Sequence, residues 1–193
     1  MEHIMKKRII LGIDPGTTIM GYGLIEGKSA GVAELLALGV LELHKHDDHY
    51  TKLKHIFDRV TSLIDHFHVT ELSIEAPFYG KNVQSMLKLG RAQGVAIAAA
   101  LSRSLDIYEY APRKIKLAIT GQGNAAKEQV AALLQKMLAI PEMPANLDAT
   151  DGLAAAVCHF FQKKPSPETY DSSHIARNWK EFMSKNPERV KPH

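Results

Sequence analysis

Three short apolar runs lie close together near the start of the chain, and their spacing limits the folds that this sequence can adopt. The runs occupy residues 9–13, 22–25 and 36–43, with glycine-containing segments between them. Strands joined by short connections pair in the antiparallel sense, because a parallel pair requires a crossover of a dozen or more residues. We therefore predict that the chain begins with three antiparallel strands.

The rest of the chain alternates helical and extended patterns. Seven apolar residues between positions 53 and 67 repeat at spacings of three and four, which predicts an amphipathic helix. Further strands are predicted at 72–75 and 107–110, and further helices at 82–104, 125–138 and 148–161, with Asn124 as the cap of the helix at 125–138. Crossovers through helices carry the later strands beside the first one. The predicted fold class is α/β: a mixed five-stranded sheet flanked by helices, in a single domain.

Length and composition agree with one packed domain. The chain has 193 residues, of which 45% are hydrophobic, which is enough to bury a sizeable core. We predict that the folded domain spans residues 6–163. Residues 164–193 hold four of the nine prolines and show little periodicity, so they are predicted to form a C-terminal tail that is partly disordered.

Charge and cysteine content restrict the setting. The formal net charge of +3 permits a nucleic-acid partner without requiring one. Cys158 is the single cysteine, so a disulfide framework within the chain is excluded and a reducing, cytoplasmic location is expected. No apolar run reaches the roughly 18 residues of a membrane span, and the N-terminus lacks the apolar segment of a signal peptide. We expect no membrane partner.

Four acidic residues occupy positions that favour a shared site. Asp14 directly follows the first strand and Glu75 ends the strand at 72–75, so two neighbouring parallel strands would bring them to one edge of the sheet. Asp148 and Asp151 stand three positions apart at the start of a helix, which places both on one face. Each has an ordinary alternative, because aspartate before Pro-Gly is a common turn residue and acids are favoured in the first turn of a helix.

A cluster of all four acids would have a definite chemistry. Crowded carboxylates repel one another unless a cation neutralises them. Oxygen ligands without a histidine or thiolate pattern suit Mg²⁺ or Mn²⁺. Two such ions held about 4 Å apart would activate a water molecule and stabilise the leaving oxygen in phosphodiester cleavage.

Three separated segments of the chain carry a family resemblance. GIDPGTTIMGYG, IEAPFYGKNVQSMLKLGRAQGVAIAAA and LDATDGLAAAVCH occur in this order between residues 8 and 161. They resemble the RuvC family of Holliday-junction resolvases, within the ribonuclease H-like superfamily. The resemblance implies a ribonuclease H-like fold with a catalytic, metal-binding tetrad at Asp14, Glu75, Asp148 and Asp151.

The same resemblance implies an activity and partners. It implies a structure-specific endonuclease that resolves four-way DNA junctions in recombination and repair, by paired Mg²⁺-dependent cleavage of two opposed strands. Two Mg²⁺ ions per active site are expected, and Mn²⁺ is expected to substitute. The implied assembly is a homodimer that works with a branch-migration helicase complex of the RuvA and RuvB type. Part of the helix at 82–104 could form the subunit interface, although Met86 and Leu87 are most simply core residues.

Aromatic and basic residues supply candidate DNA contacts. An aromatic side chain in the glycine-containing loop after the second acid can stack on or wedge between bases, whereas its alternative is local packing. Basic side chains near a helix N-terminus can bind phosphate, whereas their alternative is a solvated surface. The predicted DNA-binding residues are Phe78, Tyr79, Lys81, Asn82, Arg91, Lys114, Lys116 and Lys127. Gly16 is expected to keep the backbone close to the site, and Gly21 and Gly23 to serve a turn and the next strand.

Other functions remain open from the sequence. IDPGTT also resembles the phosphate-binding turn of actin-like ATPases, although those proteins need two such domains and a longer chain. A ribonuclease H-like RNA-processing nuclease would share the acids, but it would not be expected to carry APFYGKN. A non-catalytic scaffold that binds junctions would be expected to lack one of the four acids, and all four are present.

Overall fold

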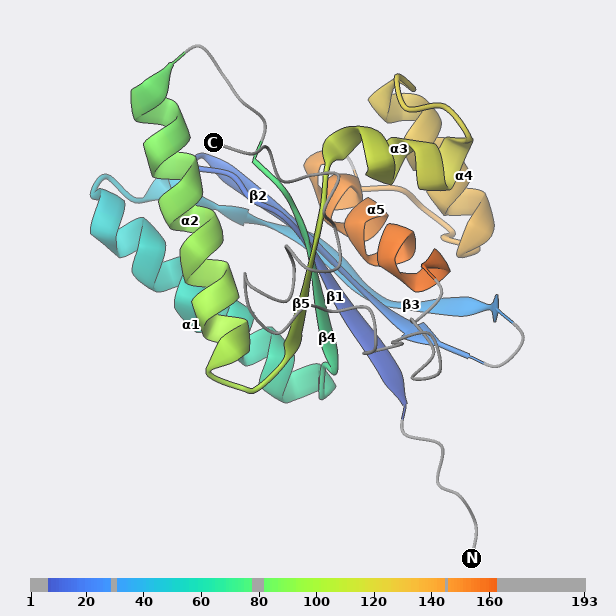
Figure 1. The fold of residues 1–193 in the computed structure, drawn as a ribbon, viewed down its shortest axis with the longest axis horizontal. Coiled ribbons are helices and arrows are strands. Elements are labelled where there is room, and N and C mark those ends of the chain that lie inside the picture. Colours follow the sequence, from blue (N-terminus) through green and yellow to red (C-terminus); the bar gives the residue numbers. More distant parts are fainter. Residues whose placement is uncertain (1–6, 29–30, 78–81, 145, 163–193) are drawn as a thin grey trace, which may run out of the picture. The chain divides into compact units, whose positions relative to one another are not determined.

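The computed structural model describes residues 7–28, 31–77, 82–144 and 146–162. The predicted tail at 164–193 lies outside these ranges. Figure 1 shows the elements, which follow one another as β1 (Arg8–Asp14), β2 (Ile19–Gly27), β3 (Ala33–Glu42), the short 3-10 helix η2 (Leu43–Lys45), α1 (His49–Phe67), β4 (Glu71–Glu75), α2 (Val83–Leu101), β5 (Asp106–Tyr110), α3 (Pro112–Thr120), α4 (Lys127–Met137) and α5 (Asp148–Phe161).

The sheet has five strands in the order β3-β2-β1-β4-β5. β2 pairs with β1 and with β3 in the antiparallel sense, as the short connections predicted. β4 pairs in parallel with β1 and with β5, because α1 and α2 supply the crossovers. The predicted mixed five-stranded sheet is confirmed, and the carboxyl ends of β1 and β4 lie at the same edge.

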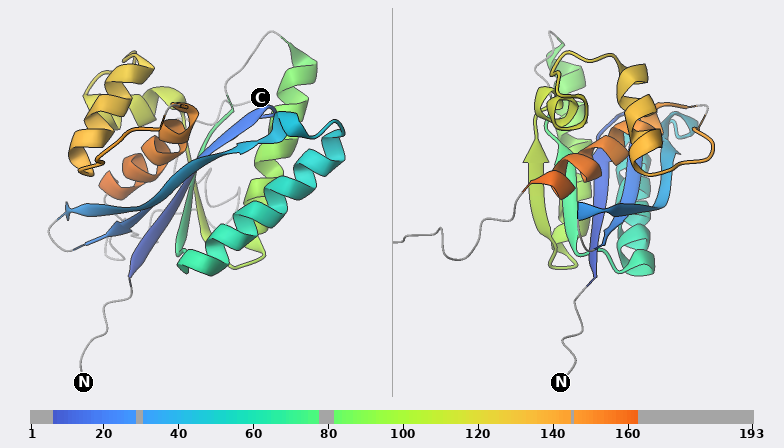
Figure 2. Two further views of the ribbon diagram at one scale, coloured as in Figure 1. Left: turned by 180° about the vertical axis from the view of Figure 1, so that it is seen from behind. Right: turned by 90° about the vertical axis from the view of Figure 1, so that its right-hand side faces the viewer.

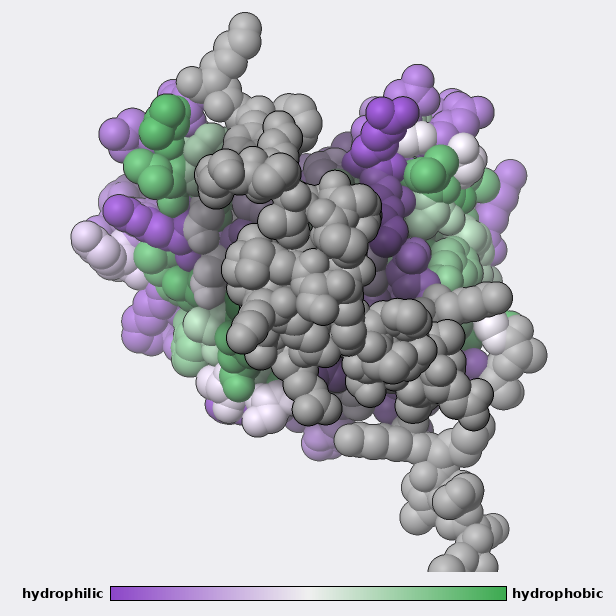
Figure 3. Space-filling view, viewed as in Figure 1, coloured by the Kyte–Doolittle hydropathy of each residue, from purple (hydrophilic) through white to green (hydrophobic). Residues whose placement is uncertain are grey.

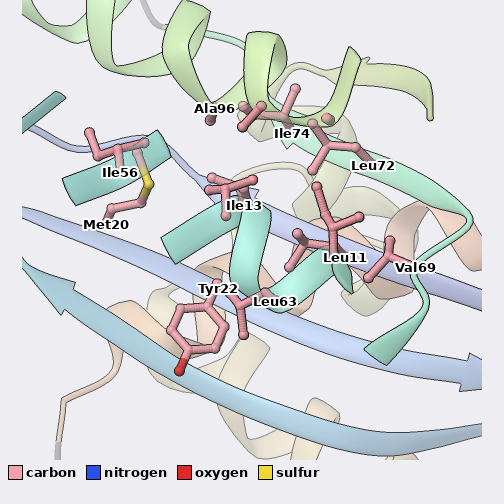
Figure 4. Packing of buried hydrophobic residues seen from close by; sticks show 14 of the residues in the cluster. Leu11, Ile13, Met20, Tyr22, Ile56, Leu63, Val69, Leu72, Ile74 and Ala96 are labelled. Atoms are coloured by element: carbon pink, nitrogen blue, oxygen red, sulfur yellow. The ribbon is translucent and has the colours of Figure 1, made fainter. Parts of the chain in front are cut away.

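Helices cover both faces of the sheet, and Figure 2 shows the two layers from behind and from the side. α1 and α2 pack on one face, over Leu11 and Ile13 of β1, in the core that Figure 4 shows from close by. α3, α4 and α5 pack on the opposite face, over Ile10. This alternation follows from the strand period of two, which points successive side chains to opposite faces.

α5 lies unusually close to the sheet because glycines face it. A Cβ atom added to Gly12 would lie 2.1 Å from the carbonyl oxygen of Gly152 in α5. A Cβ atom added to Gly21 would lie 1.9 Å from the carbonyl oxygen of Asp148, and one at Gly23 would lie 2.5 Å from Cα of Leu153. The prediction that Gly21 and Gly23 serve a turn and the next strand is therefore wrong for the turn, because both residues lie inside β2 and admit the helix backbone.

Two local predictions also differ from the structure. The helix α3 was not predicted, because its nine residues carry just two buried apolar side chains, Ile115 and Ile119, within a basic segment. Asn124 is not the cap of α4, which begins at Lys127 after Ala126. The backbone N–H of Ala126 donates instead to Oε1 of Gln129, at 2.9 Å.

Among the described residues, no helix is both long enough and apolar enough to cross a bilayer.

Candidate active site

The four predicted acids come together at the carboxyl edge of the parallel strands. Asp14 is the last residue of β1 and Glu75 is the last residue of β4. Asp148 and Asp151 lie in the first turn of α5, which the glycine contacts hold against β1 and β2. A cavity of about 260 Å³ at this edge is lined by Asp14, Glu75 and Asp151 among other residues.

Two lysines reach the same cavity from the helices beside it. Lys116 of α3 and Lys127 of α4 both line its wall. Nζ of Lys127 lies 2.6 Å from Oδ1 of Asp148 and 2.6 Å from Oδ2 of Asp151. Burial opposes the charge of Lys127, but its hydrogen bonds to the two acids outweigh burial and raise its pKa. Lys127 therefore bridges the two acids of α5.

Burial raises the pKa values of three acids of the site. Burial, followed by the negative charge of Asp151, raises the pKa of Asp14 from 3.8 to about 7. Burial, followed by the charge of Asp14, raises the pKa of Glu75 from 4.5 to about 8. Burial also raises the pKa of Asp151, although the hydrogen bond from Lys127 opposes this shift. The two lysines therefore do not offset the burial and mutual repulsion of these carboxyls.

The donor set fits a hard divalent cation. All four acids offer carboxylate oxygens, and a bound cation would oppose both the burial and the mutual repulsion that raise the pKa values of Asp14 and Glu75. Within the described ranges, no three acidic, histidine or cysteine side chains are grouped so that they could hold a metal ion as they stand. The ammonium group of Lys127 is itself a cation, and it contacts two of these acids, Asp148 and Asp151.

Gln93 is a residue of this site that the sequence reasoning missed. It is buried on α2, and its Nε2 lies 3.1 Å from Oε2 of Glu109 and 3.4 Å from the carbonyl oxygen of Glu75. These contacts connect α2 to the ends of β4 and β5. The one available signal was a polar residue at a position that the helical pattern places in the core.

The predicted DNA contacts fall in different places. Lys116 and Lys127 join the acids, whereas Nζ of Lys114 lies 4.8 Å from the ring centre of Tyr110. Arg91 is exposed on α2, and Asn82 caps that helix by accepting a hydrogen bond from the Ser85 N–H at 3.1 Å. The remaining predicted contacts lie outside the described residues: Phe78, Tyr79 and Lys81.

The strand order and the placement of the acids define a class of protein. A mixed sheet of this order, with acids at the ends of two parallel strands and on a helix that packs across them, is a ribonuclease H-like fold with a cluster of carboxyl groups at one edge. Residues 10–159 match the family described as crossover junction endodeoxyribonuclease RuvC. The chain belongs to the RuvC family.

Individual relatives support this assignment over nearly the whole chain. A crossover junction endodeoxyribonuclease RuvC from Porphyromonas gingivalis is 58% identical over 188 residues, which cover 96% of this chain and 98% of that protein. Its counterpart from Bacteroides fragilis is 60% identical over 195 residues, which cover 99% of this chain and 100% of that protein.

Solved structures agree with the sequence relatives. The structure of T. thermophilus RuvC in complex with a Holliday junction substrate matches with a TM-score of 0.74 and 31% identity, over 80% of this chain and 93% of that chain. The yeast mitochondrial Holliday junction resolvase Ydc2 matches with a TM-score of 0.59 and 12% identity, over 78% of this chain and 77% of that chain, and this likeness concerns the fold alone. The RuvC-family assignment removes the actin-like ATPase from consideration.

Proposed function

We propose that this chain is a structure-specific endonuclease that resolves four-way DNA junctions by paired cleavage of two opposed strands, in recombination and repair. The observation that carries this proposal is the cavity at the ends of β1 and β4, where acids from three elements meet two lysines. Membership of the RuvC family supports the same reaction. A cytoplasmic location and cooperation with a RuvA- and RuvB-type helicase complex are parts of the proposal.

Asp14, Glu75, Asp148 and Asp151 are the proposed catalytic residues and metal ligands. Mg²⁺, for which Mn²⁺ can substitute, supplies an activated water molecule and charge stabilisation when two ions are bound. Asp14 and Glu75 terminate paired strands, so the backbone fixes the positions from which their carboxylates hold the cations. The raised pKa values mean that these carboxyls release protons when they bind a cation.

The lysines of the site are proposed to bind the DNA backbone. Lys116 and Lys127 line the cavity, where each can donate hydrogen bonds to phosphate oxygens. Lys127 also neutralises part of the charge of Asp148 and Asp151, which reduces their repulsion of the approaching phosphate. Other DNA contacts stay predictions, and they are Phe78, Tyr79, Lys81, Asn82, Arg91 and Lys114.

A pH dependence follows from the raised pKa values. Asp14 and Glu75 hold protons more tightly in the folded chain, with pKa values of about 7 and about 8, than in the unfolded chain. The folded state therefore binds more protons between about pH 4 and pH 8, so the free energy of unfolding falls as the pH rises through this window. Because a tenfold change in an acid constant corresponds to about 1.4 kcal/mol, we expect the two acids together to lower it by several kcal/mol in EDTA.

Urea denaturation in EDTA at several pH values measures this slope. Added Mg²⁺ should restore more stability at pH 8 than at pH 6, because the acids must lose their protons to bind it. The Glu75→Gln variant is the control, and its slope should be shallower. If the free energy of unfolding falls equally steeply with pH in the two proteins, Glu75 does not contribute to the pH dependence.

A homodimer is proposed because cleavage of two opposed strands requires two active sites related by symmetry. One face of α2 offers apolar side chains to solvent: Val83, Leu87 and Leu101 are 68%, 53% and 57% exposed. Gly90 and Gly94 lie between them, and Cβ atoms added there would meet nothing within 4 Å. The expectation that Leu87 belongs to the core is therefore wrong, and apolar surface along α2 is visible in Figure 3.

Leu87→Glu should separate the dimer, because it would place a carboxylate in an apolar contact. We expect the dissociation constant to rise at least about 30-fold, the effect of losing a contact worth 2 kcal/mol. Analytical ultracentrifugation measures it. Leu117→Glu is the matched control, because Leu117 on α3 is also 53% exposed. A Leu87→Glu protein that dimerises as tightly as this control would exclude α2 from the interface.

The alternatives predict different substrates. A ribonuclease H-like RNA-processing nuclease would cut RNA in preference to a four-way DNA junction, and a scaffold would bind the junction without cutting it. Parallel assays with labelled RNA, linear duplex and junction distinguish these functions. The proposed domain boundaries, 6–163 for the nuclease and 164–193 for the tail, stay predictions.

A further inference from the structure

A buried polar network lies away from the cavity and has no part in the proposed chemistry. His159 and Glu71 are each 3% exposed, and Nε2 of His159 lies 2.9 Å from Oε2 of Glu71. The hydroxyl oxygen of Tyr110 lies 2.7 Å from Nδ1 of His159. Nε of Arg8 donates to Oε2 of Glu71 at 2.9 Å. Buried polar groups of this kind are costly unless they are paired, so the network strongly favours one arrangement.

Three members of this network belong to the elements that carry the acids, and Tyr110 belongs to β5. Arg8 is the first residue of β1, Glu71 is the first residue of β4, and His159 lies in the last turn of α5. The four proposed catalytic acids stand at the opposite ends of these same three elements. A rotation or sliding of α5 at His159 would therefore move the acids of its first turn relative to those of β1 and β4.

The hydrogen-bond directions in the network depend on the tautomer of His159. When Nε2 carries the proton, it donates to the carboxylate of Glu71 and Nδ1 accepts from the hydroxyl of Tyr110; Nη2 of Arg8 also lies 3.3 Å from Nε2. Burial, followed by the charge of neighbouring groups, raises the pKa of Tyr110 to about 12, so its hydroxyl retains the proton that it donates. Tyr108 stacks on the imidazole with ring centres 4.0 Å apart, which fixes the ring plane.

Side-chain hydrogen bonds add a directional restraint to the packing of α5. Gly12, Gly21 and Gly23 admit the helix backbone close to β1 and β2, and Ile10 and Ile25 share its core cluster. Ser73 adds one hydrogen bond from β4, with its Oγ 2.7 Å from the carbonyl oxygen of Ala155. Hydrogen bonds are directional whereas apolar packing is not, so the network at His159 contributes to the angular restraint of α5.

We propose that His159 is a positioning residue for the nuclease reaction: through Glu71 and Tyr110 it sets the rotation and height of α5, and thereby the spacing of Asp148 and Asp151 from the acids on the strands. The inference rests on the proposed function of those acids. His159 does not itself contact the cavity.

His159→Phe tests the proposal, because phenylalanine can keep the stack on Tyr108 while it loses both ring hydrogen bonds; Glu71 stays paired with Arg8. We expect the cleavage rate at saturating Mg²⁺ to fall about 10- to 100-fold, as for other changes that disturb the support of a metal site. Junction binding in EDTA should stay within about twofold. Mn²⁺ binding to the full chain without DNA, measured by electron paramagnetic resonance, should weaken about tenfold.

Two further variants separate positioning from stability. Tyr110→Phe removes one hydrogen bond, so it should fold and should lower the cleavage rate in the same direction by about three- to tenfold. Val60→Ala opens a cavity in the core on the other face of the sheet, so it should lower stability without changing Mn²⁺ affinity.

The outcomes separate the positioning role from the proposed function. The proposal is overturned if His159→Phe and Tyr110→Phe bind Mn²⁺ and cleave junctions as Val60→Ala does. If both variants bind Mn²⁺ more weakly, the positioning role is supported. If the unmodified chain also cuts no junction, the proposed function is contradicted while the positioning role stands.

Discussion

The Asp14→Asn protein binds a four-way junction at least as tightly as the unmodified protein and does not cut it. Asparagine keeps the size of the side chain but removes a proposed metal ligand and a negative charge that repels phosphate. The loss of cleavage should exceed about 100-fold, because changes to groups that merely support metal ligands already cost 10- to 100-fold. Cleavage and binding assays on the same labelled junction measure both quantities.

The matched control is Asp106→Asn, which makes the same substitution at an exposed residue at the other end of the parallel strands. It should cut at the rate of the unmodified protein. Asp14→Asn should also be more stable than the unmodified protein at pH 8 in EDTA, because it removes a buried carboxyl whose ionisation is unfavourable. Wild-type cleavage by Asp14→Asn would exclude Asp14 from the mechanism.

Gly21→Ala should damage both stability and cleavage, although it adds a single methyl group. The added Cβ atom would lie 1.9 Å from the carbonyl oxygen of Asp148, which is backbone and cannot rotate away. α5 must then move off β2, and its first turn carries Asp148 and Asp151 with it. We expect the free energy of unfolding to fall by about 2–3 kcal/mol, in the upper range for overpacked cores, and cleavage to fall at least tenfold.

Gly27→Ala is the matched control, because it makes the same change on the same strand. Its Cβ atom would approach the ring of Phe160 at 2.9 Å, and a side-chain ring can shift. Urea denaturation and junction cleavage should therefore change much less than for Gly21→Ala. Equal losses in the two variants would contradict the account of close α5 packing.

The acids could be predicted from the sequence because each of their positions follows from a local pattern. An apolar run that ends in an acid locates Asp14 and Glu75 at strand ends, and the order of strands and helices makes those strands neighbours. Asp148 and Asp151 follow from helical spacing. Their catalytic role stays a prediction, which the assays proposed above test.

The features that could not be predicted depend on contacts between distant segments. Lys127 bridges Asp148 and Asp151 because the connections around α4 bring its first residue to α5, and no spacing in the sequence encodes this approach. His159 meets Glu71 across 88 positions of the chain. Gly21 was assigned to a turn because glycine signals both turns and close packing, and only the position of α5 distinguishes the two.

The most direct test is cleavage of a labelled synthetic four-way junction against a linear duplex of the same sequence, in Mg²⁺ or in EDTA. Several crossover sequences should be used, since an unsuitable one would hide activity. Paired, symmetric nicks on the junction in Mg²⁺, with none on the duplex and none in EDTA, are the predicted result. Tight junction binding without nicks on any crossover sequence would contradict the nuclease and leave a scaffold.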